Sequence, residues 1–137
     1  MLKKINLKVK TDLGVCAEVL SWFEQLNQPP IPDKDIWYKC QTLLWEAFTN
    51  IAEHAHKDLP PETPIDIEAT RFDRHIEIRI WCYGPWFNVN QKLQEIPEFE
   101  DNEDERGRGL KIISLLADNF SYEQVNERNC MLIAKQY

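Results

Sequence analysis

The stretch LLWEAFTNIAEHAH, residues 43–56, places the polar side chains of Glu46, Asn50 and Glu53 beside the apolar face of an expected helix. Residues four positions apart are neighbours on a helix surface, so the side chains of Glu46 and Asn50 can reach a single ligand. An amide oxygen suits Mg²⁺, and a carboxylate can accept a proton from an attacking hydroxyl or water. The pattern fits a magnesium–nucleotide site, with Asn50 on the metal and Glu46 as the base. It also fits an ordinary polar pair on a solvated helix edge.

A second group of residues that could do chemistry lies in DERGRGLKII, residues 104–113. Gly107 and Gly109 let a ligand come close to the backbone, and a helix that starts there directs free N–H groups toward it. Arg106 and Arg108 flank the glycines, where they can meet phosphate oxygens. The same glycines can also serve a plain turn. A third segment, WCYGPWFN, indicates by itself only a reversal of the chain.

The elements that would position these residues follow from hydrophobic periodicity. Alternation with period two predicts strands, and apolar residues at helical spacing predict helices. Expected strands span 3–11, 120–126 and 130–136, a hairpin spans 64–83 with its turn at 72–74, and helices span 13–26, Asp33 or Asp35 to about His56, and 107–120. An irregular stretch fills 84–106. This order predicts an α/β (α+β) two-layer sandwich, a mostly antiparallel mixed sheet with helices on one face.

Size and charge narrow the class of protein. The 137 residues fit one domain, 1–137, and the net charge of −7 argues against a general nucleic-acid binder, which needs a basic surface. No stretch approaches the ~20 apolar residues of a membrane span, and the N-terminal MLKKINLKVK lacks the apolar core of a signal peptide. We therefore expect a cytoplasmic protein without direct nucleic-acid or membrane partners.

The four cysteines, at positions 16, 40, 82 and 130, stand far apart among apolar neighbours. Because no CxxC pair exists, neither a zinc site nor a disulfide framework is indicated. We expect reduced and mostly buried thiols.

Taken together and in this order, EAFTNIAEHA, the Gly-Pro-x-Phe turn and GRGL resemble the anti-sigma-factor serine/threonine kinases. These kinases belong to the histidine-kinase-like, or GHKL, ATPase superfamily, and the resemblance covers residues 10–136. It implies an α/β sandwich that holds ATP and Mg²⁺ between the long helix and a mobile lid. The lid would span residues 86–106. The polar edge of the opening helix then corresponds to the family's N box.

The resemblance assigns roles to residues of the N box. Glu46 stands at the position of the general base, and Asn50 stands at the Mg²⁺-binding asparagine. His54 and Ala55 match the pair that closes the box. The position of His54 on the helical wheel, inside the apolar arc, predicts a hydrogen-bonded core histidine rather than a catalytic one.

The two glycine segments also find counterparts in the family. Gly84 matches the glycine of the adenine-side turn, and Gly107 and Gly109 match the second glycine box near the phosphates, which Arg106 and Arg108 flank. The acidic run EFEDNEDE in the lid is expected to be a solvated loop, because exposed charge runs cost little.

The chain departs from the family on the adenine side. Cys82 takes the place of the aspartate that accepts a hydrogen bond from the adenine amino group, so a charge-assisted bond of roughly 1.5–3 kcal/mol is lost. Trp86 replaces a small residue. Cys130 stands where relatives carry a threonine that helps hold adenine through water.

Two functional hypotheses follow. In the first, the protein is an ATP-dependent serine/threonine kinase that sequesters a sigma factor and phosphorylates an anti-anti-sigma antagonist, which is partner switching. In the second, nucleotide binding is lost and the domain is a protein-binding module only. A homodimer is possible through aromatic residues such as Trp22, Trp37 or Trp45.

Overall fold

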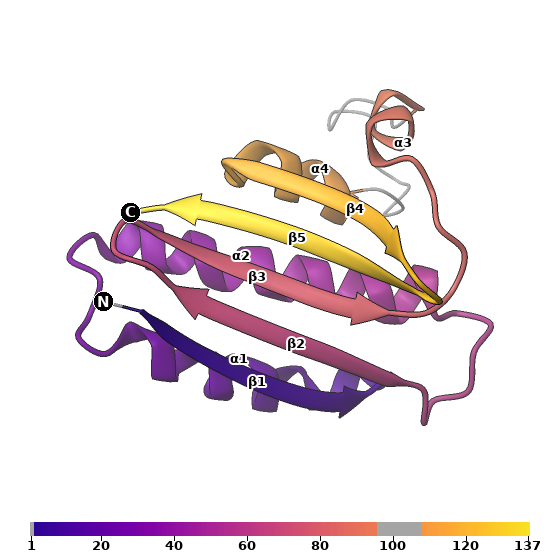
Figure 1. The fold of residues 1–137 in the computed structure, drawn as a ribbon, viewed down its shortest axis with the longest axis horizontal. Helices are drawn as coiled ribbons and strands as arrows, with labels where there is room; N and C mark the ends of the chain where they lie inside the picture. Colours follow the sequence, from indigo (N-terminus) through magenta and orange to yellow (C-terminus); the bar gives the residue numbers. More distant parts are fainter. Residues whose placement is uncertain (1, 96–107) are drawn as a thin grey trace.

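The computed structural model describes residues 2–95 and 108–137 (Figure 1). The strands are β1 (Lys3–Lys10), β2 (Pro64–Arg71), β3 (His75–Cys82), β4 (Asn119–Val125) and β5 (Arg128–Gln136). The helices are η1 (Leu13–Val15), α1 (Cys16–Phe23), η2 (Glu24–Asn27), α2 (Lys34–Asn50), η3 (Ile51–Ala55), α3 (Val89–Glu95) and α4 (Arg108–Leu116).

The described strands form one sheet in the order β1-β2-β3-β5-β4, and each of its pairings is antiparallel. Alternating residues of β2 and β3 pair across the sheet, Ile67 with Ile80 and Ala69 with Ile78. Because successive side chains of a strand point to opposite faces, one residue in two of each run faces the helices. The expectation of a mostly antiparallel sheet is thus confirmed, and among the described strands no parallel pair occurs.

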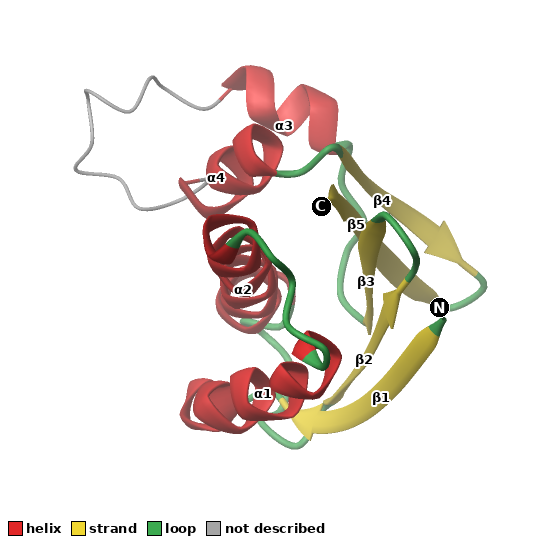
Figure 2. Cartoon of the chain, turned by 90° about the vertical axis from the view of Figure 1, so that its left-hand side faces the viewer, coloured by secondary structure: helices red, strands yellow, loops and turns green. Residues whose placement is uncertain are grey.

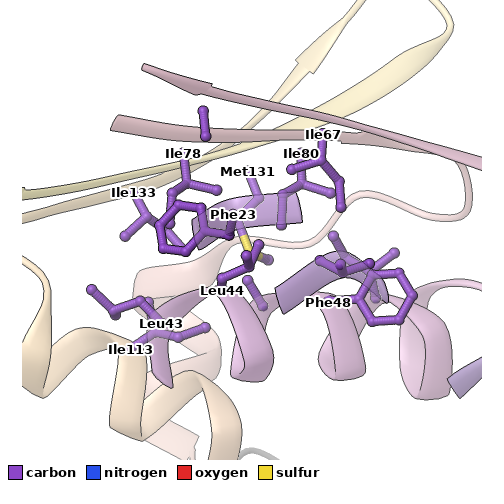
Figure 3. Close-up of a cluster of buried hydrophobic side chains, with 14 of the residues drawn as sticks. Phe23, Leu43, Leu44, Phe48, Ile67, Ile78, Ile80, Ile113, Met131 and Ile133 are labelled. Atoms are coloured by element: carbon purple, nitrogen blue, oxygen red, sulfur yellow. The ribbon is translucent and has the colours of Figure 1, made fainter. Parts of the chain in front are cut away.

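The helices α1, α2 and α4 form a layer on one face of the sheet (Figure 2). The helix α2 begins after Asp33, whose carboxylate accepts a hydrogen bond from the Asp35 amide at 2.9 Å. Side chains from α1, α2, α4 and the inner face of the sheet meet in one apolar cluster (Figure 3). Its labelled members are Phe23, Leu43, Leu44, Phe48, Ile67, Ile78, Ile80, Ile113, Met131 and Ile133. This two-layer α+β arrangement confirms the predicted fold class.

One segment differs from the expectation of an irregular stretch over 84–106. Residues Val89–Glu95 form α3, which the Asn88 side chain caps by accepting a hydrogen bond from the Gln91 amide at 3.1 Å. The remainder of that stretch, residues 96–107, lies outside the described residues.

Two expectations about particular side chains can be compared with the fold. All four cysteines are free and buried, as expected. Trp45 is 44% exposed, but Trp37 is buried and stacks on Phe23 with ring centroids 4.8 Å apart. The expectation that Trp37 is an exposed dimer contact is therefore wrong, because this ring belongs to the core. Among the described helices, none combines the length and the apolar character needed to cross a membrane.

Truncation of one core residue should test the packing of α2 on the sheet. We expect Leu44→Ala, at a residue with 0% exposure, to lower the free energy of unfolding by about 2–5 kcal/mol. The matched variant Leu115→Ala, at a leucine that is 65% exposed, should change it by less than about 0.5 kcal/mol. Urea unfolding followed by circular dichroism measures both values. Equal losses in the two variants would contradict this assignment of the core.

Candidate functional site

The end of α2 is not an ordinary helix terminus. Its last residue, Asn50, leads directly into η3, a π-helical turn. The His56 amide donates to the Ile51 carbonyl at 2.9 Å, five residues back, which is the hydrogen bond of a π-turn. Such turns occur often at functional sites because they widen the helix and redirect the side chains that follow.

The π-turn explains why the expectation for His54 is wrong. A helical wheel at about 100° per residue places His54 in the apolar arc, but a wider turn rotates the residues after Ile51 away from that phase. His54 is exposed, and His56 takes the buried place with 1% exposure. Periodicity gave no signal for His56, since the sequence does not mark where the π-turn begins.

A pocket of about 490 Å³ opens beside this turn. It lies between the end of α2, η3, the 84–87 turn, α3 and α4, and its walls combine polar and apolar groups. The lining residues are Asn50, Glu53, His54, Ala55, Lys57, Pro85, Phe87, Lys92 and Leu110. Two of the three polar residues on the edge of this helix, Asn50 and Glu53, therefore meet in one cleft, together with two lysines.

Glu46 lies one turn before Asn50 and is half-buried. Its carboxylate lies against the first turn of α4, where a Cβ atom on Gly109 would come within 2.9 Å of Glu46 Oε2. A helix start carries a partial positive charge, which favours a carboxylate at this place. The structure thus brings Glu46 close to Gly109. Glu46 is not among the described residues that line the pocket.

Gly84 is the residue through which the sheet side of the pocket contacts the helix side. Its φ is +94°, and a Cβ atom would lie 2.2 Å from the Ala55 carbonyl oxygen. Only glycine combines that backbone conformation with so close an approach. The buried Asn129 adds a second tie, since its side-chain amide donates to the Gly84 carbonyl at 3.0 Å.

The adenine-side cysteine, Cys82, is 0% exposed and is not among the described pocket residues. Its sulfur lies 3.6 Å from the Tyr122 hydroxyl, and the Phe87 ring packs on Tyr122 with centroids 4.8 Å apart. Trp86 donates its indole N–H to the Tyr122 carbonyl at 2.9 Å. Burial raises the pKa of Cys82 to about 11, so the thiol is neutral at pH 7. Cys82 is therefore buried against Tyr122, and Tyr122 in turn contacts Phe87, which lines the pocket.

Cys130 is not brought to the cleft. In the β3–β5 register, Asn129 pairs with Cys82, and Cys130 pairs with Trp81. Because successive strand residues alternate between faces, Cys130 lies on the sheet face away from the helices. The residue of β5 that shares a face with Cys82 is Asn129, one position earlier, which the sequence reasoning missed.

His56 joins the elements behind the pocket. The Tyr83 amide donates to His56 Nε2 at 2.8 Å, and His56 Nδ1 lies 2.8 Å from the Thr11 hydroxyl. That hydroxyl donates to the Thr63 carbonyl at 2.7 Å. Burial lowers the pKa of His56 below its ordinary value, so the ring is neutral at pH 7.

The remaining predicted residues are Arg108, at the start of α4, and two residues that precede it in the sequence. Arg108 is the first residue of α4, whereas Arg106 and Gly107 lie outside the described residues. The same holds for the part of the expected lid that follows Glu95. Its first part, residues 86–95, contributes the second half of the 84–87 turn and the whole of α3, beside the pocket.

Alanine substitutions should show that Gly84 contributes more to the stability of the fold than Gly109 does. Gly84→Ala places a methyl group against the Ala55 carbonyl and forces a left-handed alanine, which costs about 1–2 kcal/mol before the clash is added. In Gly109→Ala the new methyl meets the end of the Glu46 side chain, which can turn away, so we expect a smaller loss. Thermal unfolding measures both variants. A Gly84→Ala protein as stable as the wild type would show that the turn does not need this backbone contact.

The comparison with known protein families agrees with the site. A family model described as histidine kinase-like ATPase domain matches residues 9–135, which is nearly the whole chain. The comparison with curated proteins gave no match. The matched range contains the π-turn, the 84–87 turn and α4, which together surround the pocket. The chain belongs to the histidine kinase-like ATPase domain family.

Proposed function

We propose that this domain binds a magnesium nucleotide in the pocket beside η3 and acts as a serine/threonine kinase of the anti-sigma type. The observation that carries the proposal is the polar half of the pocket, where Asn50 meets the cations Lys57 and Lys92. Amide oxygen and ammonium groups suit a divalent cation and phosphate oxygens respectively. Family membership implies the same ligand class.

The described residues fit the phosphate side of such a ligand. Asn50 would hold Mg²⁺ through its side-chain oxygen, and Lys57 and Lys92 would bind phosphate oxygens. Bound ATP would supply the γ-phosphoryl group. Glu46 would accept the proton from the serine hydroxyl of a protein substrate as its oxygen bonds to phosphorus and ADP leaves.

The partner assignment rests on the resemblance of residues 46–55, 84–87 and 107–110 to the anti-sigma-factor kinases. The substrate would be an anti-anti-sigma antagonist phosphorylated on serine, and the sequestered partner would be a sigma factor, both in the cytoplasm. Trp45, which is exposed on α2, is a candidate contact for a homodimer.

A second function is favoured by a specific observation on the base side of the pocket. Tyr122 and Phe87 cover Cys82, so the position of the family's adenine-binding carboxylate offers a ligand no acceptor. A domain that has lost nucleotide binding in this way would act only by binding its protein partners.

Calorimetric titration with ATP, with and without Mg²⁺, distinguishes the two functions. We expect binding that depends on Mg²⁺ in the wild type and the loss of that dependence in Asn50→Ala, because the amide oxygen is the metal ligand. Asn6→Ala, at an exposed residue of β1, is the matched control and should bind as the wild type does. No heat up to millimolar ATP from a folded wild-type protein would leave the binding module as the function.

The role of Glu46 has its own test. Glu46→Gln keeps the size and hydrogen-bonding capacity of the side chain but removes the base, so transfer of phosphate to the antagonist's serine should fall at least ~100-fold. The affinity for magnesium ATP should stay within about twofold. Glu53→Gln, a carboxylate that lines the pocket two turns further along the helix, is the control and should retain transfer. Undiminished transfer by Glu46→Gln, followed with radiolabelled ATP, would exclude Glu46 as the base.

A further inference from the structure

We propose that neutral His56 is a positioning residue for the pocket. Its ring binds the Tyr83 amide and so holds the segment 83–87, which is Tyr83 and the 84–87 turn, against the end of η3. The proposal concerns the shape of the pocket and does not depend on which ligand the pocket binds. It assigns a function to a buried histidine that neither the kinase nor the binding-module hypothesis uses.

The hydrogen bonds around the ring fix its protonation state. The Tyr83 amide can only donate, so Nε2 of His56, 2.8 Å away, must carry a lone pair. The Thr11 hydroxyl donates its hydrogen to the Thr63 carbonyl and therefore accepts at its oxygen from Nδ1–H of His56. Each contact is satisfied only by the neutral ring with its proton on Nδ1.

The ring acts on the pocket through the chain that follows Tyr83. Gly84 is in contact with the Ala55 carbonyl, and the next residues, Pro85 and Phe87, form one wall of the pocket. Ala55 and His54, just before His56, line the pocket from the η3 side. The hydrogen bond between His56 and the Tyr83 amide therefore sets the distance between the η3 side of the pocket and the 84–87 turn.

Protonation would break this arrangement. A second N–H on the ring would face the Tyr83 N–H across 2.8 Å, and two donors cannot share that contact. Tyr83 is the titratable neighbour on the β3 side. The charged residues of the surrounding elements are exposed, and none of them is hydrogen-bonded to the ring within the described part of the chain: Lys10, Asp12, Glu53, His54, Lys57, Asp58 and Glu62.

The burial of His56 determines whether stability rises or falls with pH. Burial lowers the pKa of His56 in the folded protein, so the unfolded chain takes up a proton first as the pH falls. The contribution of the neutral ring to stability is complete above the ordinary histidine value, about 6.5, and decreases as the pH falls below it. As the pH falls below about 6.5 and His56 takes up a proton in the folded protein, the segment 83–87 should lose its hydrogen bond to the ring.

The test uses nitrogen-15 spectra of the full chain between pH 8 and pH 5. Two signals report on the turn, the Tyr83 amide and the Trp86 indole, which donates to the Tyr122 carbonyl. In the wild type we expect both to shift together, with a midpoint below about 6.5. In His56→Gln the side-chain oxygen can still accept from Tyr83 but cannot titrate, so the signals should keep their neutral positions throughout.

Further variants make the result specific. The chain has three histidines, so His54→Gln and His75→Gln are matched controls, and both should retain the wild-type transition. His56→Leu has no acceptor and should show displaced Tyr83 and Trp86 signals at every pH. Signals of His56→Gln that shift as those of the wild type do, or of a folded His56→Leu that stay in the wild-type position, would overturn the proposal. If His56→Leu does not fold, the comparison of wild type with His56→Gln decides.

Discussion

The pocket depends on the contact between two backbone segments, Gly84 after β3 and the Ala55 carbonyl at the end of η3. This contact joins the helical layer to the sheet beside the pocket. A side chain on residue 84 would separate the layers by the width of a methyl group, and the walls of the pocket would move with them. Asn129 and His56 hold the same junction from the sheet side and from behind.

The pocket is made of two chemically different halves. Asn50, Lys57 and Lys92 supply an amide and two cations, whereas Pro85, Phe87 and Leu110 supply apolar surface. Although the chain has a net charge of −7, the described lining of this cleft has two lysines and one carboxylate, Glu53, so its local charge favours an anionic ligand. The polar groups are the feature that favours the kinase hypothesis, and the buried Cys82 is the feature that favours the binding-module hypothesis.

The sequence predicted those features that follow from period and composition. Alternation in β2 and β3 and helical spacing in α2 predicted the two-layer fold, and Asn50, which the polar edge of the helix singled out, lines the pocket. The sequence could not predict where His54 and His56 point, because a single π-turn changes the angle of every residue after it. It also misplaced Cys130, because a shift of one residue in a strand moves a side chain to the other face.

The opposite orientations of Cys82 and Cys130 have a consequence for the chemistry of oxidation. The two residues lie on paired strands only one register position apart, a spacing that could suggest a cross-strand disulfide. A disulfide requires Cβ atoms about 4 Å apart that point toward each other, and here the sheet itself separates the two sulfurs. Oxidation therefore cannot crosslink β3 to β5 through this pair unless the strands change their register.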